Sequence, residues 1–398
     1  MKHKRRSRMI SAAIAAVLCL FLAGCGRGSG TVPQTDTSGK IEVDGSGSEE
    51  KLQDTSEDVS MDASIDVSEE SASLGMEAEI PDFYEKEAGA VSFQTDVVVS
   101  EEVRKNGLQK ISVSLQKPDP AKVLECLMGD TEITEKNEEE GNNWYVGADG
   151  ENLTIHHTSI GFATKFYVYV SNAFRLQQEY SDYNADKYET DKDLEFASRQ
   201  EAFEDIRQML ETMGIQIGEQ YKCYVLEHSV LQREEYAMDI NGNIDQANYK
   251  GSWTGEDDSY YFAISQKYGD TPAYHVFYDH SPLAADENAP IQVLYNKDGI
   301  QFLQLEKVFT FTEQEGNYDL MPFEEIAEVI ETKYEAQADG NTYSVRRATL
   351  YYMENKVNEQ EYEVVPVWIF NTVQNETGKN LQDIVNAQTG EEIIWEDC

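Results

Sequence analysis

The segment from residue 239 to residue 245 places an oxygen-bearing side chain at every second position. The four residues are Asp239, Asn241, Asn243 and Asp245. Calcium-binding loops begin with oxygen ligands at this spacing, so the segment is a candidate metal site with calcium as the cofactor. However, Ile244 stands where an EF-hand loop has glycine, and Lys250 stands where it has a bidentate glutamate. Asn241-Gly242 is also a strong hairpin signal, so the sequence favours a hairpin and leaves a calcium site as the alternative.

The histidines form no evident catalytic or metal-binding group. His156 and His157 are adjacent, so on a strand they point to opposite faces. His275 and His280 are five positions apart and do the same, and Asp279 beside His280 carries little information in so acidic a chain. No GxSxG, HExxH, Walker or dinucleotide-binding motif occurs in the sequence. The sequence therefore predicts no catalytic residue and no enzymatic activity.

Cys25 stands at the end of a pattern typical of protein export. Five basic residues lie within the first eight positions, and an apolar run from Met9 to Leu22 follows them. That run is shorter than the roughly 20 apolar residues that a transmembrane helix needs. Its ending, Leu22-Ala23-Gly24-Cys25, resembles the lipobox of bacterial lipoproteins. The resemblance implies that residues 1–24 are a signal peptide and that a lipid on Cys25 anchors the protein to the cell membrane, on its extracytoplasmic side. The alternatives are an ordinary secretory signal and a short membrane anchor.

The charge balance narrows the range of partners. The formal net charge is −43, and loss of the five basic residues of the signal would lower it to −48. Such a surface repels nucleic acid phosphates, so we expect no nucleic acid partner. Three cysteines remain besides Cys25 and Cys19, namely Cys126, Cys223 and Cys398, and they show no CxxC spacing. We expect no disulfide framework, because an odd number of thiols cannot all pair within one chain.

Aromatic residues mark the boundary between a tether and the folded part. No aromatic residue occurs from Gly26 to Asp82, where 15 acidic residues stand against three basic ones. Such a segment cannot bury enough apolar surface to offset its ordering entropy, so we predict a disordered acidic tether over residues 25–88. The length of the remainder favours two lobes, which we place at residues 89–196 and 197–398.

The order of periodic segments predicts an α+β fold with mostly antiparallel sheets, each packed against one or two helices. Helices are expected from Asp119-Pro120 to Gly129, after a capping box at residues 198–201, and over residues 323–334. Strands are expected over 109–115, 144–146, 153–156, 166–170, 221–226, 260–264, 273–278, 291–295 and 300–311. Hairpin turns outnumber crossover helices, which argues against a two-domain solute-binding protein.

The last eighty residues show a helix followed by three strand-like runs. The second run contains Pro366-Val367-Trp368, and the third closes with Asn386-Ala387-Gln388-Thr389-Gly390-Glu391. This order resembles the PepSY-type module and the C-terminal repeat of YycH/YycI-like regulators, and it is similar to uncharacterised lipoproteins of Gram-positive bacteria. The resemblance covers residues 318–398 and implies a non-catalytic domain that binds or restrains another extracytoplasmic protein. On that basis we expect Trp368 near a protein contact.

Together these features predict a membrane-anchored binding or regulatory module whose partner is an envelope or sensor protein. One alternative is a solute- or glycan-binding lipoprotein, with a groove lined by Tyr260-Tyr261-Phe262, Tyr274 and Tyr278. The other is a cell-envelope hydrolase with an unrecognised acidic site. A carboxyl group in a cleft with a strongly raised pKa would favour the hydrolase.

Overall fold

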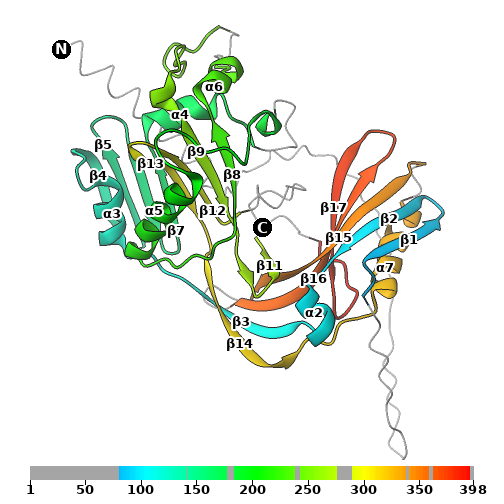
Figure 1. Cartoon of the computed structure of the whole chain (residues 1–398). Coiled ribbons are helices and arrows are strands. Elements are labelled where there is room, and N and C mark those ends of the chain that lie inside the picture. Colours follow the sequence, from blue (N-terminus) through cyan, green and yellow to red (C-terminus); the bar gives the residue numbers. More distant parts are fainter. Residues whose placement is uncertain are drawn as a thin grey trace, which may run out of the picture. The chain divides into compact units, whose positions relative to one another are not determined.

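The computed structural model describes residues 80–139, 141–176, 183–237, 243–275, 289–337, 340–357 and 362–394 (Figure 1). The signal peptide, Cys25 and nearly all of the predicted tether lie outside these residues. Within the described ranges, no helix has both the length and the apolar character needed to cross a membrane.

The central part of the chain forms an eight-stranded, entirely antiparallel sheet. Its strands, in spatial order, are β4 (Ile133–Glu139), β5 (Asn142–Gly147), β6 (Asn152–His156), β7 (Ser159–Ala163), β13 (Gly299–Leu305), β12 (Ile291–Asn296), β9 (Ser259–Ile264) and β8 (Tyr221–Leu226). Strands β4 and β8 are therefore the two edges of this sheet.

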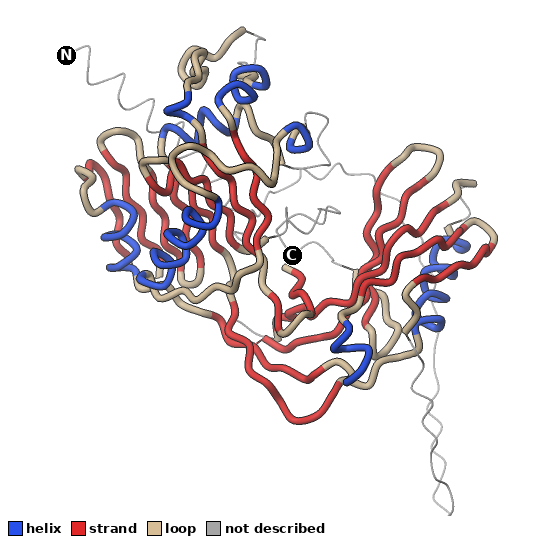
Figure 2. The backbone as a smooth tube through the Cα atoms, in the orientation of Figure 1, coloured by secondary structure: helices blue, strands red, loops and turns tan. Residues whose placement is uncertain are grey.

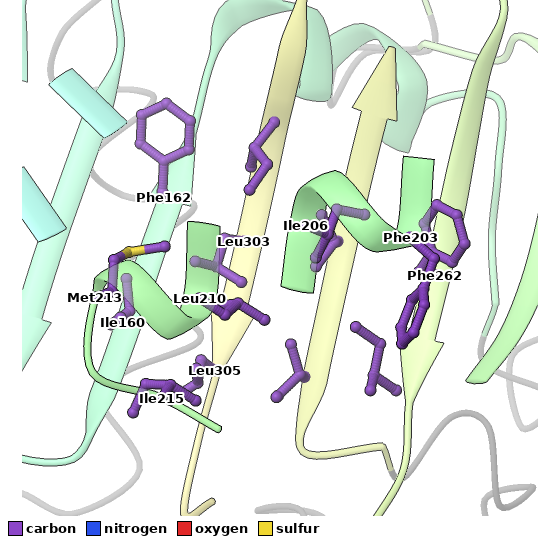
Figure 3. Close-up of a cluster of buried hydrophobic side chains, with 14 of the residues drawn as sticks. Ile160, Phe162, Phe203, Ile206, Leu210, Met213, Ile215, Phe262, Leu303 and Leu305 are labelled. Carbon is purple, nitrogen blue, oxygen red and sulfur yellow. The ribbon is translucent and has the colours of Figure 1, made fainter. Parts of the chain in front are cut away.

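Apolar side chains cover both faces of the eight-stranded sheet. Helices α3 (Pro120–Met128) and α5 (Arg199–Thr212) pack on one face, where α5 contributes Phe203, Ile206 and Leu210 to the core (Figure 3). The core of the other face includes side chains from α4 (Lys165–Ser171) and α6 (His228–Glu234). Two short 3₁₀ turns, Ala185–Lys187 and Gly255–Asp257, complete this part of the chain.

The two ends of the described chain meet in a seven-stranded sheet. Its strands are β1 (Phe83–Ala88), β2 (Val91–Val98), β10 (Lys267–Tyr268), β11 (Thr271–Tyr274), β15 (Tyr343–Lys356), β16 (Tyr362–Gln374) and β17 (Lys379–Asn386). The long strand β15 pairs with β16 on one side, and on the other side it runs parallel to β2 and then to β11. Helices α2 (Glu101–Asn106) and α7 (Phe323–Ala336) contribute side chains to the core of this sheet.

A two-stranded antiparallel ribbon carries the chain between the two sheets. It consists of β3 (Gln109–Leu115) and β14 (Phe309–Asn317) (Figure 2). The architecture confirms the predicted α+β class with mostly antiparallel sheets.

The predicted lobe boundaries, in contrast, do not follow the sheets. The expected division between residues 196 and 197 falls inside the eight-stranded sheet, because β4 to β7 precede it and β8, β9, β12 and β13 follow it. Strand β1 also begins at Phe83, within the stretch assigned to the tether. The reason is long-range pairing: β2 pairs with β15 across about two-thirds of the chain, and no local pattern reports such a partner.

One predicted strand is a helix. Residues 166–170 belong to α4, although the sequence Phe-Tyr-Val-Tyr-Val has high strand propensity. Tyr167 stacks on Phe302 of β13 with 3.9 Å between ring centroids, and Val170 is buried. Tertiary packing of this helical face therefore overrides the local propensity.

The helix and the three strands expected in the last eighty residues form, and the strands pair as two antiparallel hairpins. Gly390, at the closing turn, has φ +72°, a conformation that glycine adopts without strain. A proline within a strand is typical of a sheet edge, yet β16, which contains Pro366, lies between β15 and β17. The last β16–β17 pair joins Val367 to Asn386, so Pro366 stands where that pairing ends and its missing N–H costs no ladder hydrogen bond.

Candidate functional site

An open groove of about 580 Å³ lies between the start of α5 and the edge strand β8. We call it the α5–β8 groove. Its lining residues are Thr190, Arg199, Gln200, Phe203, Glu219, Tyr221, Lys222 and Cys223. The groove is therefore mainly polar, with three charged side chains among its lining residues.

Local sequence signals fix the helix that forms one wall. The Ser198 hydroxyl accepts a hydrogen bond from the Glu201 backbone N–H, and the Glu201 carboxylate accepts one from the Ser198 backbone N–H. This capping box satisfies donors that the helix start would otherwise expose. Because Glu201 occupies the helix N-terminus, that terminus is not an open anion site.

The other wall is the unpaired side of β8. Val225 donates its backbone N–H to the Glu189 carbonyl at 2.7 Å, so the backbone groups of Val225 point away from β9. Backbone groups alternate in direction along a strand, and the N–H and C=O of Tyr221 and Cys223 therefore point the same way. Among the described residues, the Glu189 bridge is the only pairing on this side of β8. The groove thus borders two residues of β8, Tyr221 and Cys223, whose backbone groups on this side have no strand partner among the described residues.

Aromatic stacking joins the two walls at the floor of the groove. The rings of Phe203 and Tyr221 are stacked with 4.3 Å between centroids. Both contact Phe262 of β9, and Figure 3 shows Phe203 beside Phe262. Burial raises the pKa of the Tyr221 hydroxyl. Cys223 is 4% exposed, and burial raises the pKa of its thiol well above the ordinary range. A thiol held in the neutral form is a poor nucleophile, so the floor is a packing surface.

The two cations of the groove have different surroundings. The Arg199 guanidinium lies 3.1 Å from the Asp193 carboxylate and donates a hydrogen bond to the Thr190 carbonyl. Lys222 has an exposed side chain whose Nζ lies 4.8 Å from the centroid of the Tyr224 ring. Arg199 is therefore part of a local ion pair, and the Lys222 ammonium lies over an aromatic ring of the same strand.

The described residues include only two of the four residues of the predicted calcium site. Asp239 and Asn241 lie outside the described residues. Asn243 and Asp245 are described, and the Asp245 carboxylate accepts hydrogen bonds from the Ala247 backbone N–H and the Asn248 side chain. No group of three metal-ligating His, Cys, Asp or Glu residues occurs in the described ranges. Calcium binding stays a prediction.

Trp368, predicted near a protein contact, lies in the core. Its side chain is 1% exposed, and its ring packs edge-on against Phe323 of α7 with 4.9 Å between centroids. The side chain is not at a surface, so it cannot touch a partner of the folded protein. The predicted contact is corrected accordingly: β16 is an interior strand, and its large apolar residues fill the space under α7.

The aromatic strands proposed for a glycan groove are also core. Tyr260, Tyr261 and Phe262 on β9 are at most 6% exposed, because apolar layers cover both faces of that strand. Tyr274 is 8% exposed and lines a small cavity beside β11, and Tyr278 lies outside the described residues. Tyr260, Tyr261 and Phe262 are therefore packing residues of the core.

A second cavity, of about 280 Å³, lies beside β11. His275, one of its lining residues, is 5% exposed, and its Nδ1 lies 3.6 Å from a Glu354 carboxylate oxygen. Near it, Glu306 is 3% exposed, and burial raises the pKa of its carboxyl group, partly offset by His275. This is the raised carboxyl pKa that a hydrolase would need, but Glu306 is not part of the cavity lining. It is therefore not placed to reach a substrate there.

Sequence reasoning located the elements of the α5–β8 groove but missed the groove itself. The capping box and the strand at residues 221–226 were both predicted. That β8 is an edge depends on pairing with β9, about forty residues away in the chain. The available signal was Lys222, a charge in an otherwise apolar strand, which is typical of edge strands.

Comparison with known proteins gives no assignment. No protein-family model and no curated protein matches the chain. Among solved structures, it is similar to an uncharacterized protein from Eubacterium rectale, with 17% identity, a TM-score of 0.49, and coverage of 79% of this chain and 94% of that one. It is also distantly similar to the YpeB C-terminal domain of Bacillus megaterium, with 10% identity, a TM-score of 0.26, and coverage of 74% and 95%. At these identities and TM-scores, neither likeness assigns a ligand or an activity.

Proposed function

We propose that this protein is a lipid-anchored, extracytoplasmic binding module, and that it holds an extended segment of an envelope protein along the edge of β8. The observation that supports the proposal is the direction of the Tyr221 and Cys223 backbone groups, which point into the α5–β8 groove. Exposed strand edges bind extended peptides through main-chain hydrogen bonds, with side-chain pockets adding specificity. The bridge from Glu189 to Val225 shows that this edge already accepts one neighbouring segment.

Two further features of the groove favour a binding function over a catalytic one. The cysteine of the groove is held in its neutral form by burial, and the helix start is filled by its own capping box. The lipobox at Cys25 would hold the module at the outer side of the membrane, where its partner would be an envelope or sensor protein.

Photo-crosslinking within the cell tests this function. A photoreactive amino acid at Gln200, on the groove wall, is compared with the same amino acid at Gln208, an exposed position of the same helix outside the groove. We expect Gln200 to capture a defined envelope protein that Gln208 does not capture. Equal capture at both positions, or no capture at Gln200, would contradict the proposal.

The glycan-binding and hydrolase alternatives lack a supporting site in the described residues. Of the aromatic residues assigned to the first, Tyr260, Tyr261 and Phe262 are buried in the core. Glu306, the carboxyl group that fits the second, is not among the residues that line the cavity beside β11.

A further inference from the structure

Two histidine rings lie in contact at the turn between β6 and β7. On a continuous strand the adjacent side chains of His156 and His157 would point to opposite faces. In the structure β6 ends at His156, and the ring centroids of the two histidines are 4.8 Å apart, with 79° between the ring planes. The structure therefore brings together two side chains that the sequence was expected to keep apart.

The conformation of the turn explains this contact. His156 pairs with Ser159, so the hairpin closes through His157 and Thr158. Two-residue hairpin turns that match the twist of their strands need positive φ, and His157 has φ +36°. Histidine adopts this conformation more often than most residues do. His157 thus leaves the alternation of the strand, and its ring lies on the same side as His156.

The neighbouring hairpin turn leaves room for the His157 ring. The carbonyl of Gly141, in the turn between β4 and β5, accepts a hydrogen bond from the His157 backbone N–H at 3.2 Å. A Cβ atom at position 141 would overlap the His157 imidazole, so only glycine leaves the space that this ring occupies. The two adjacent turns therefore set the position of the ring.

The separation of the two rings fits a shared metal ion. An imidazole nitrogen binds zinc at about 2.0–2.1 Å, which puts the ring centroid about 3.2 Å from the ion. Two imidazoles bound to one ion, at angles between square-planar and tetrahedral, then have centroids about 4.5–5.1 Å apart. The observed 4.8 Å lies within this range. Edge-to-face packing of rings spans about 4.5–7 Å, so packing without an ion is the competing explanation.

The surroundings of the pair favour a cation from solvent. His156 and His157 are both exposed, and neither ring makes a hydrogen bond or an ion pair with a residue that the structure describes. Glu139 of β4 pairs with Asn142, and Asn142 pairs with His156, so these three side chains share one face of the sheet. The chain has a formal net charge of −43, and a negative surface raises the local concentration of cations.

We propose that His156 and His157 together bind one divalent transition-metal ion, such as Zn²⁺ or Cu²⁺, with water at the other coordination positions. Imidazole nitrogen suits these ions, whereas Ca²⁺ and Mg²⁺ prefer oxygen ligands. Two histidine ligands are consistent with the lack of any three-residue metal group in the described ranges. Strands β6 and β7 are not neighbours of β8, so this site is separate from the α5–β8 groove and independent of the function proposed for it.

Zinc titration of the full-length, detergent-solubilised protein tests the proposal. The chain has six histidines, so ¹³C-labelled histidine gives few enough imidazole NMR signals to follow each one. Zn²⁺ should shift the His156 and His157 signals together, with the same concentration dependence. Ca²⁺ at the same concentrations should leave both signals in place. Equal shifts with both ions would show a general effect of bound cations and would overturn the site.

Three variants locate the ligands by isothermal titration calorimetry. His156→Gln and His157→Asn each remove one imidazole, and asparagine tolerates the positive φ at position 157. Each should weaken zinc binding by about tenfold or more, because loss of a residue that only orients a metal ligand already costs about 10–100-fold. His228→Gln removes another exposed histidine, which pairs with Asp258, and should change the affinity by less than about twofold.

The two measurements together decide between a shared ion and ring packing. Native affinity in both variants at the turn, or no shift of either signal with Zn²⁺, would show that the rings only pack against each other. Loss of binding in one of these variants but not in the other would show a single ligand and would also overturn a shared site. The shifts of the native protein remain decisive if a variant fails to fold, which circular dichroism would reveal.

Discussion

Tyr221 on the edge strand β8 stacks on Phe203 of α5, with 4.3 Å between ring centroids and 29° between ring planes. This contact connects a helix fixed by its own capping box to a strand with an open edge. It therefore joins the two walls of the α5–β8 groove and links them to the core of the eight-stranded sheet.

Truncation of this contact should destabilise the fold. Phe203 is 2% exposed, so Phe203→Ala removes buried contacts and leaves a cavity, and we expect the free energy of unfolding to fall by about 3–4 kcal/mol. Urea unfolding followed by circular dichroism measures the change. Gln200→Ala, three residues earlier and exposed, serves as the control and should stay within about 0.5 kcal/mol. A loss below about 1 kcal/mol for Phe203→Ala would contradict the packing described here.

Glu306→Gln should stabilise the protein at neutral pH. Burial raises the pKa of the Glu306 carboxyl group above its ordinary value of 4.5, with opposing contributions from His275, Gln304 and Lys307. The proton is therefore held more tightly in the folded state, and this stabilisation is complete below pH 4.5 and lost as the pH rises through the folded-state pKa. The gain in the variant should grow over that window, by about 1.4 kcal/mol per pKa unit, and then level off.

The control for that pH series is Gln314→Ala, an exposed residue of β14 whose side chain does not titrate. Its difference from the native protein should not change over the same window. A Glu306→Gln variant that is less stable at neutral pH than at pH 4, relative to the native protein, would have the opposite sign from the one expected.

Asp383→Ala should lower the free energy of unfolding, because Asp383 of β17 joins that strand to α7 and β16. The Asp383 carboxylate is 3% exposed and accepts hydrogen bonds from Tyr334 at 2.8 Å and Thr372 at 2.9 Å, with the Lys333 ammonium at 2.7 Å. Removal of one member of a buried charged network leaves its partners unsatisfied, so we expect a loss of about 3 kcal/mol. Asp270→Ala breaks an exposed pair with Lys267 and should cost less than about 1 kcal/mol. Equal effects of the two substitutions on thermal unfolding would refute a structural role for the network.

Cys25→Ala should abolish lipid attachment. The proposed lipobox requires the thiol of Cys25, so cells expressing the native chain should incorporate labelled palmitate into the protein and those expressing the variant should not. Cys126→Ala, which changes a half-buried thiol of α3, should leave labelling intact. Labelling that persists in Cys25→Ala would refute the proposed anchor.

The sequence predicted the parts of the fold that local signals determine. Asp119 caps α3, and its carboxylate accepts hydrogen bonds from the first-turn N–H groups of Ala121 and Lys122, as the Asp-Pro pair indicated. The capping box of α5 was foreseen for the same reason. Each signal lies within a few residues of the element that it specifies.

The parts that long-range contacts determine were not foreseen. The parallel pairing of Val91 with Tyr343 joins the ends of the described chain in one sheet, and it makes β16, with Trp368, an interior strand. The edge position of β8 follows likewise from distant pairing. The candidate site therefore depends on topology, and its residues carried only one local signal, the charge of Lys222.

Amide hydrogen exchange along β8 tests the central claim most directly. In the free protein, the Tyr221 and Cys223 amides should exchange faster than those of Lys222 and Tyr224, whose N–H groups point toward β9. Binding of the captured envelope protein should slow exchange at Tyr221 and Cys223 and leave Lys222 and Tyr224 unchanged. Slow exchange at Tyr221 and Cys223 in the free protein, or no slowing when the partner is bound, would contradict an open strand edge that receives a partner.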